Sequence, residues 1–147
     1  MQLTISDLKA EDRPRWAELW RGYLAFYETV LPDEQYDDTW ARLLHGTSIH
    51  GLAARRNGAM VGITHYLFHA HCWISSPACY LQDLFVDPAA RGTGAGRALI
   101  EGVADRARAQ ASGRMYWRTQ AGNSTARRLY DAVARDTGFI VYDYKLE

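Results

Sequence analysis

The chain has 147 residues, of which 48% are hydrophobic and 23% charged, and 17 basic and 17 acidic side chains give a formal net charge of zero. This length fits one compact domain, predicted over residues 1–147, which buries roughly two-thirds of its unfolded surface without a disulfide or metal. The balanced charge excludes a nucleic-acid protein held by bulk electrostatics. No apolar run approaches the roughly 20 residues that span a bilayer, and no export signal is visible, so we expect a cytoplasmic protein without a membrane partner.

The chain contains two cysteines, Cys72 and Cys79. Two thiols alone do not complete a four-ligand zinc site, and their spacing matches no redox motif. We expect two buried thiols in a reducing compartment, with a disulfide across a hairpin as the alternative.

The first third of the chain predicts one strand and two helices. Apolar and polar residues alternate over 2–8, which is typical of a strand. The acidic residues and proline of 11–14 mark a helix start, and aromatic and leucine side chains recur at helical spacing over 16–27. A second helix is predicted over 33–44, ending near Gly46.

The middle of the chain changes to the period of strands. Residues 49–55 and 59–73 flank the dipeptide Asn57-Gly58, which supplies the positive φ angles of a tight hairpin turn. A further strand is predicted over 79–86.

The last third alternates helices and strands. Helices are predicted over 94–110 and 124–136, the second with Gly138 as its C-cap, and strands over 114–119 and 139–146. The order β-α-α-β-β-β-α-β-α-β predicts one mixed α/β sheet with helices packed on its faces.

A glycine-rich loop, residues 91–97, joins the strand at 79–86 to the following helix. Alternating glycines let the backbone approach a ligand, and the free N–H groups and dipole of the helix start favour a phosphate or pyrophosphate. The loop has no lysine, which excludes a Walker loop, and Arg97 stands where a dinucleotide fingerprint needs its last glycine. The alternative is a tight structural connection.

The pattern Arg91-x-x-Gly94-x-Gly96, placed after the run 84–88 (LFVDP), resembles the acetyl-CoA loop of the GNAT acyltransferases. The likeness covers nearly the whole chain and is greatest to small enzymes that acetylate polyamines, histones or amino acids. It implies a single-domain GNAT fold, with a mixed central sheet, a splayed central strand and helices on both faces. It also implies a homodimer that moves an acetyl group from acetyl-CoA to a primary amine by direct attack in a ternary complex.

The resemblance also implies roles for individual residues. Tyr130 matches the tyrosine that protonates the departing CoA thiolate, and such a leaving group needs a proton near neutral pH. Backbone N–H donors of the splayed strand are expected to polarise the thioester carbonyl, because negative charge builds on its oxygen. Contact with acetyl-CoA is expected for Leu84, Phe85, Val86, Arg91, Gly92, Thr93, Gly94, Ala95, Gly96, Arg97 and Asn123.

One position departs from the polyamine enzymes of this family. They carry a glutamate where this chain has Gln82, which does not ionise. Either the acceptor amine is less basic, or another group acts as base through water, with Asp83, Glu28 and His65 as candidates. We expect Asp83 to be catalytic, although a structural ion pair explains it equally well. Contact with the acceptor is expected for Tyr27, Glu28, Gln82 and Trp117, and Trp117 could instead line a dimer seam.

Two further features have alternative interpretations. His65, His69 and His71 are predicted on one strand face, where a partly solvated surface is favoured over a metal site, so no metal is expected. Residues 28–38 carry five acidic side chains and no lysine or arginine, which would attract a cationic amine, although solvated helix-start residues explain part of this charge.

The sequence thus predicts an N-acetyltransferase that uses acetyl-CoA and acts on a small primary amine, either a polyamine or an amino acid. A protein lysine or N-terminus is the alternative acceptor. A non-catalytic acyl-CoA sensor is the alternative class, because it would need the loop at 92–96 but not the acid Tyr130.

Overall fold

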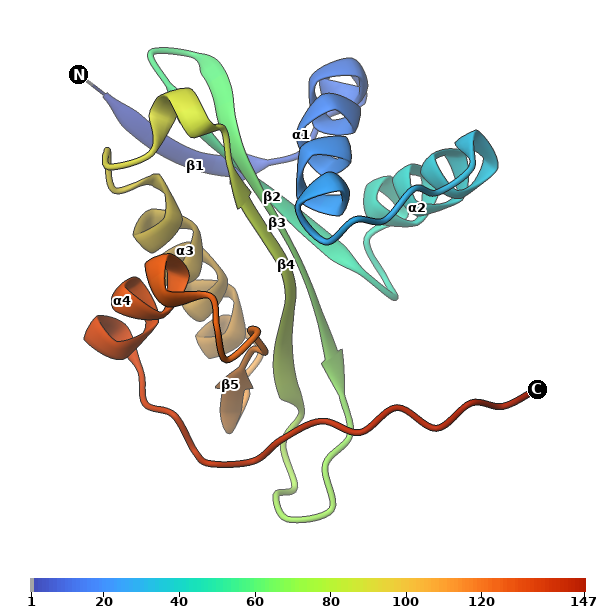
Figure 1. Ribbon diagram of the computed structural model, residues 1–147, viewed down its shortest axis with the longest axis vertical. Helices are drawn as coiled ribbons and strands as arrows, with labels where there is room; N and C mark the ends of the chain where they lie inside the picture. The colour runs from blue at the N-terminus through green and yellow to red at the C-terminus, as the bar shows by residue number, and fades with distance from the viewer. Residues whose placement is uncertain (1) are drawn as a thin grey trace.

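The computed structural model describes residues 2–147, which form one five-stranded sheet with helices on both faces (Figure 1). The elements in chain order are β1 (Leu3–Asp7), the 3-10 turn η1 (Ala10–Asp12), α1 (Arg13–Phe26), α2 (Asp33–His45), β2 (His50–Arg56), β3 (Ala59–His69), β4 (Ala78–Val86), the 3-10 turn η2 (Pro88–Ala90), α3 (Ala95–Ala109), β5 (Arg114–Tyr116) and α4 (Ser124–Val133). The strands lie in sequence order; the first four pair antiparallel, and β5 is parallel to β4. This mixed sheet confirms the predicted fold class.

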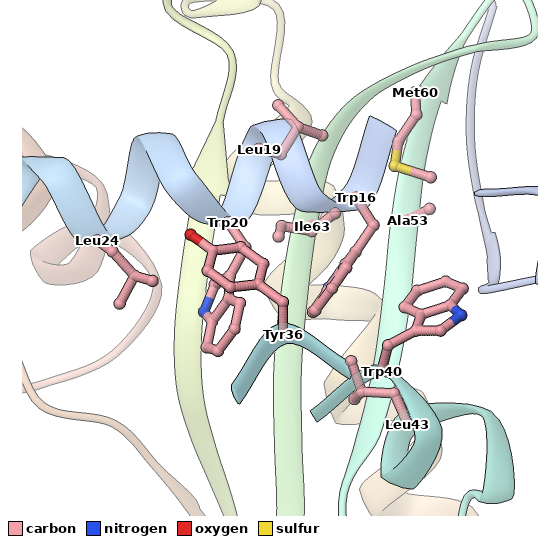
Figure 2. Packing of buried hydrophobic residues seen from close by; sticks show 10 residues of the cluster. All are labelled: Trp16, Leu19, Trp20, Leu24, Tyr36, Trp40, Leu43, Ala53, Met60 and Ile63. Atoms are coloured by element: carbon pink, nitrogen blue, oxygen red, sulfur yellow. The ribbon is translucent and has the colours of Figure 1, made fainter. Parts of the chain in front are cut away.

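Two apolar clusters hold the layers together. On one face, α1 and α2 pack on β2 and β3 through an aromatic cluster in which Trp16 lies 5.2 Å from Trp20 and 4.9 Å from Trp40 between ring centroids (Figure 2). On the other face, α3 packs on β2, β3 and β4 through fully buried side chains such as Leu99 and Val103. The α1–α2 face is the one that carries the candidate site.

Local sequence signals account for the ends of several elements. Asn57 and Gly58 have φ angles of 52° and 88°, as the tight turn between β2 and β3 requires. Gly46 caps α2 in the left-handed region, with φ 72°, and its N–H donates to the carbonyl of Arg42. The hairpin and the end of α2 are therefore confirmed.

Other predicted boundaries were wrong. The strand predicted over 59–73 ends at His69, and the strand predicted over 114–119 is only Arg114–Tyr116, because β4 offers it just three paired residues. The last helix ends at Val133, since Ala134 is already extended, and Gly138 is therefore not its cap. The closing strand predicted over 139–146 is also wrong: this segment is exposed and belongs to no sheet.

The expectation of two buried thiols was half right. Cys79 is fully buried, whereas Cys72 is exposed, and both are free, so the alternative of a hairpin disulfide is wrong. Among residues 2–147, the helices are too short or too polar to cross a lipid bilayer.

Candidate active site

The strand β4 leaves its neighbour β5 after its first three residues, which confirms the splayed strand. It pairs with β5 only through Ala78–Tyr80, so among residues 2–147 its later residues have no strand partner on that side (Figure 1). The N–H of Asp87 donates to the carbonyl of Val61 on β3 at 2.8 Å. Because backbone groups alternate along a strand, the N–H groups of Leu84 and Val86 face the open side. They are available to a ligand there.

The loop after β4 has the geometry of an anion cradle. Gly92 and Gly94 have φ angles of 80° and 88°, which side-chain-bearing residues rarely adopt, and a Cβ at either position would point into open space. Gly94 is the N-cap of the 15-residue helix α3, whose first N–H groups and dipole therefore face that space. These residues fit the pyrophosphate of a coenzyme A.

The other loop residues have distinct surroundings. Thr93 donates its hydroxyl to the carbonyl of Ala90 at 2.6 Å, which holds the turn closed. Gly96 also serves packing, because a Cβ there would lie 3.3 Å from Cδ2 of Leu129 on α4. Arg91 and Arg97 are exposed, and Arg91 donates to the carbonyl of Val86 at 3.3 Å.

Two predicted cofactor residues have structural roles in addition. Asn123 caps α4, with its side-chain oxygen accepting from the N–H of Ala126 at 3.4 Å. The ring of Phe85 lies against α1, since a Cβ on Gly22 would be only 2.8 Å from its Cζ atom. Ala95, at the start of α3, is buried. Contacts of these residues with acetyl-CoA stay predictions.

A cavity of about 250 Å³ lies between α1, α2 and the strands β3 and β4. This volume lies just below the roughly 300–1,000 Å³ of typical small-molecule sites, so the cavity suits a compact ligand. Its walls include three residues that the sequence singled out, His65, Gln82 and Asp83. They also include four residues that it did not: Trp20, Gln35, Thr39 and Arg42.

Asp83 and His65 form a buried pair in the wall of this cavity. His65 Nδ1 lies 2.8 Å from Asp83 Oδ2, and the two side chains are 5% and 15% exposed. The indole N–H of Trp16 donates to His65 Nε2 at 2.9 Å, so that nitrogen is an acceptor and the ring proton is on Nδ1, directed at Asp83. The indole of Trp20 also donates to Asp83 Oδ2, at 3.3 Å. Both tryptophans extend from α1 toward the sheet (Figure 2).

The surroundings of Asp83 keep its carboxylate ionised. Burial pushes its pKa upward, but the hydrogen bonds that Asp83 accepts, first from His65 and then from Tyr23 and Trp20, outweigh burial, and the net pKa is lowered. The cavity therefore has one negative charge at its base. On the cavity wall from α2, Arg42 supplies a positive charge, and its Nε donates to Asp38 at 2.9 Å.

The predicted acid, Tyr130, lies on the half-buried face of α4. Its ring packs edge-on against Trp117 with centroids 5.4 Å apart. Burial, and then the nearby Tyr27, raise the pKa of Tyr130, so its hydroxyl stays protonated at neutral pH. Burial, and then Asp83, raise the pKa of Tyr27 at the end of α1. Asp83 therefore acts on Tyr27, whereas the charge interaction of Tyr130 is with Tyr27.

Not all predicted acceptor residues lie together. Gln82 and Asp83 line the cavity, whereas Tyr27, Glu28 and Trp117 do not belong to its walls. Glu28 is exposed at the end of α1, with φ 54°. A bulge explains the position of Gln82 and Asp83: Asp83 pairs with His65 of β3 and Leu81 pairs with the next residue, Tyr66, which leaves Gln82 as an additional residue.

The interpretation of the histidines needs correction. His65 is 4% exposed and bonded to Trp16 and Asp83, so it does not lie on a solvated face. His69 is bonded through Nε2 to the hydroxyl of Tyr116 at 2.7 Å. Within residues 2–147, no three His, Cys, Asp or Glu side chains gather as they would around a metal ion. The sequence shows that Trp16 can donate a hydrogen bond, but it does not show that His65 is the acceptor. The packing of α1 on β3 brings the two side chains together.

The family comparison agrees with this geometry. Residues 16–134 match the model of the acetyltransferase (GNAT) family. The chain is 34% identical over 144 residues to the D-amino-acid N-acetyltransferase HPA3 of Saccharomyces cerevisiae, covering 96% of this chain and 89% of that protein. It is 33% identical over 145 residues to the N-acetyltransferase YhfO of Bacillus subtilis, covering 95% of each chain.

Solved structures show the same fold at lower identity. A ribosomal-protein-alanine N-acetyltransferase from Brucella melitensis superposes with a TM-score of 0.83 at 23% identity, over 99% of this chain and 100% of that one. The aminoglycoside acetyltransferase AAC(6')-Iy, bound to a bisubstrate analogue of CoA, superposes with a TM-score of 0.86 at 18% identity over 99% of both chains. The splayed strand, the glycine cradle and these likenesses lead to one conclusion: the chain belongs to the GNAT acetyltransferase family and is an acetyl-CoA-dependent N-acetyltransferase.

Proposed function

We propose that the acceptor is the α-amino group of an amino acid. The observation that carries this proposal is the pair of opposite charges on the walls of one small cavity, Asp83 at the sheet and Arg42 on α2. An amino acid carries an ammonium and a carboxylate a few bonds apart, and these charges complement Asp83 and Arg42 respectively. A buried carboxylate that faces a binding cavity attracts a cationic group strongly, because the surrounding dielectric is low.

The charges around the cavity favour an amino acid over a polyamine. One of the acidic residues that could attract a polyamine is already engaged, since Asp37 pairs with Arg13. A polyamine would bring further positive charge toward Arg42. The yeast relative is named as a D-amino-acid N-acetyltransferase, which supports the same class of acceptor.

The residues of the site divide the chemistry. Bound acetyl-CoA supplies the activated acetyl group. The cradle from Gly92 to Gly96 holds the pyrophosphate, and the N–H groups of Leu84 and Val86 stabilise charge on the thioester oxygen. Asp83 orients the acceptor nitrogen; its lowered pKa makes it a weak base, so the ammonium proton leaves through water. Tyr130, protonated at neutral pH, donates to the thiolate.

The homodimer and the cytoplasmic location that the sequence predicts belong to the same proposal. The unpaired thiols of Cys72 and Cys79 support a reducing compartment. A protein acceptor is disfavoured by the small volume of the cavity, which suits a free amino acid better than an extended polypeptide.

The test is release of CoA thiol from acetyl-CoA with D- and L-amino acids, their decarboxylated amines, spermidine and a lysine-rich peptide. We expect turnover with amino acids and at least tenfold lower kcat/KM with the matching amines. In Arg42→Gln, KM for the amino acid should rise at least tenfold, while kcat/KM for the amine stays unchanged.

Asp38→Asn is the matched control, because it frees Arg42 without removing its charge, and KM for the amino acid should not rise. Equal kcat/KM for amino acids and their amines would overturn the amino-acid proposal. Turnover with spermidine alone would establish a polyamine enzyme, and tight acetyl-CoA binding without any turnover would indicate a sensor.

A further inference from the structure

The sheet face that carries Asp83 continues beyond the cavity toward β5. The residues on either side of Tyr80 in β4 are buried in the cluster of α3, so Tyr80 lies on the opposite face, with Asp83. Tyr23 of α1 joins the two positions, because its hydroxyl donates to the carbonyl of Gln82 at 3.5 Å. Burial, then Asp83 and, more weakly, Tyr80 raise the pKa of Tyr23, so its hydroxyl lies near both. Tyr80 therefore borders the site of Asp83.

A cationic side chain lies over this continuation of the face. The rings of Tyr80 and Tyr116 stack, with 4.9 Å between their centroids and 20° between their planes, so Tyr116 of β5 shares the face of Tyr80. The guanidinium carbon of Arg118, two residues later, lies 5.8 Å from the centroid of the Tyr80 ring, within the range of a cation–π interaction. The positive charge of Arg118 is thus held beside the acceptor site.

This guanidinium is available to a ligand. Arg118 is exposed, and within residues 2–147 it forms no ion pair with a carboxylate. The other arginine on this face, Arg114, already contacts its own neighbours: it lies 3.2 Å from Nε2 of His71 and over the ring of Tyr116. A guanidinium presents a fork of donors that matches a carboxylate, so an anionic group is the expected partner of Arg118.

Arg42 and Arg118 lie on opposite sides of Asp83. The helix α2, which carries Arg42, packs on β2, whereas β5 lies beyond β4 at the other side of the sheet (Figure 1). Because β5 is parallel to β4 and its last residue pairs with Tyr80, the chain after β5 advances from the level of Tyr80 toward that of Asp83. A nitrogen bound at Asp83 therefore has one positive charge on each side.

We propose that the acceptor is an amino acid with a carboxylate in its side chain, and that Arg118 binds this carboxylate. The inference rests on the proposed function, in which Asp83 takes the ammonium and Arg42 the α-carboxylate. The side chain is then the substituent directed toward β5. A strand advances about 3.3 Å per residue, so with one residue taken up by the bulge, Asp83 and Tyr80 are roughly 7 Å apart along β4. This span favours glutamate over the shorter aspartate.

The test compares acceptors that differ in one charge. Glutamate and glutamine have nearly the same shape, so the ratio of their kcat/KM values, measured with the D and the L forms, isolates the side-chain charge. In the wild type we expect at least tenfold higher kcat/KM for glutamate. In Arg118→Gln the ratio should fall to about one, because kcat/KM decreases for glutamate and stays constant for glutamine.

Arg114→Gln is the matched control. It makes the same substitution on the same sheet face, but at the end of β5 farther from Asp83, and the glutamate to glutamine ratio should stay that of the wild type. Arg118→Glu reverses the charge and should invert the preference, so that arginine becomes a better acceptor than glutamate. A wild type that does not distinguish glutamate from glutamine overturns the inference. It is also overturned by an unchanged ratio in Arg118→Gln, an equal loss in Arg114→Gln, or an Arg118→Glu variant that still prefers glutamate.

A second pair of acceptors separates this inference from the proposed function. Alanine and ethylamine differ only in the α-carboxylate and have no charged side chain, so their kcat/KM ratio does not depend on Arg118. Equal values for alanine and ethylamine would contradict the proposed function. A preference for alanine over ethylamine, together with equal values for glutamate and glutamine, would leave the proposed function standing and overturn the role of Arg118 alone.

Discussion

The imidazole of His65 and the carboxylate of Asp83 share a 2.8 Å hydrogen bond in the wall of the cavity between α1, α2 and the sheet, with Trp16 donating to the opposite nitrogen of the ring. We predict from this arrangement that His65 is a positioning residue. It keeps Asp83 ionised and aimed, although burial favours the neutral acid.

His65→Leu should therefore change how acceptor binding depends on pH. Without the imidazole donor, burial raises the pKa of Asp83, so its charge is lost at a higher pH. We expect KM for the acceptor to increase at least tenfold between pH 7.5 and pH 5.5 in the variant, beyond any change in the wild type, while the Kd for acetyl-CoA stays constant. His50→Leu, which removes an imidazole that stacks on Tyr66 from β2, is the control. A parallel pH profile in wild type and His65→Leu would contradict this role.

Tyr130→Phe should reduce turnover at least tenfold and leave acetyl-CoA affinity nearly unchanged. The phenyl ring keeps the contact with Trp117 but removes the proton donor for the leaving thiolate. Steady-state kinetics and calorimetric binding of acetyl-CoA measure the two effects. Tyr116→Phe, which loses only the hydroxyl contact with His69, should stay within twofold of the wild type. Unchanged turnover in Tyr130→Phe would remove the tyrosine from the mechanism.

Gly94→Asp should abolish acetyl-CoA binding. The new side chain would occupy the space that the cradle leaves open and would place a negative charge against the pyrophosphate. Gly58→Asp is a matched control, since Gly58 also has φ 88° and open space around its Cβ but lies in the β2–β3 turn. Both variants carry the same backbone strain, so only the first should lose binding in calorimetry. Equal loss in both would make strain the cause.

A second buried charge pair should control stability in acid. Arg55 donates to both oxygens of Asp12, at 3.0 and 2.7 Å, and chiefly this hydrogen bonding lowers the pKa of Asp12. A carboxyl with a lowered pKa in the fold contributes stability above its unfolded pKa of about 3.9, and that contribution is lost as the pH falls through the lowered value. Asp12→Asn should destabilise the protein by about 3 kcal/mol at pH 7.

Denaturant unfolding from pH 7 to pH 2 measures this effect. The difference between wild type and Asp12→Asn should shrink below pH 4, where the wild-type carboxyl becomes protonated. Asp105→Asn removes an exposed partner of Arg108 and should change stability by less than about 1 kcal/mol. A difference between wild type and Asp12→Asn that is constant down to pH 2 would show that the charge of Asp12 is not what stabilises the fold.

The sequence by itself determined the features that depend on near neighbours in the chain. The Asn57-Gly58 turn, the left-handed cap at Gly46 and the glycines of the cradle follow from backbone preferences that a few residues set. The amphipathic helices likewise follow from spacing. For the same reason the cofactor loop could be predicted as a motif.

Only the tertiary structure decided the features that join distant residues. The indole of Trp16 meets His65 across 49 positions, and Arg42 reaches the cavity of Asp83 because α2 packs beside α1 on the sheet. The bulge at Gln82 directs Asp83 and depends on register with β3. The closing strand predicted over 139–146 shows the limit most clearly: its alternating pattern predicts a strand, but a strand forms only where a neighbouring edge supplies its hydrogen bonds, and among residues 2–147 no edge does so.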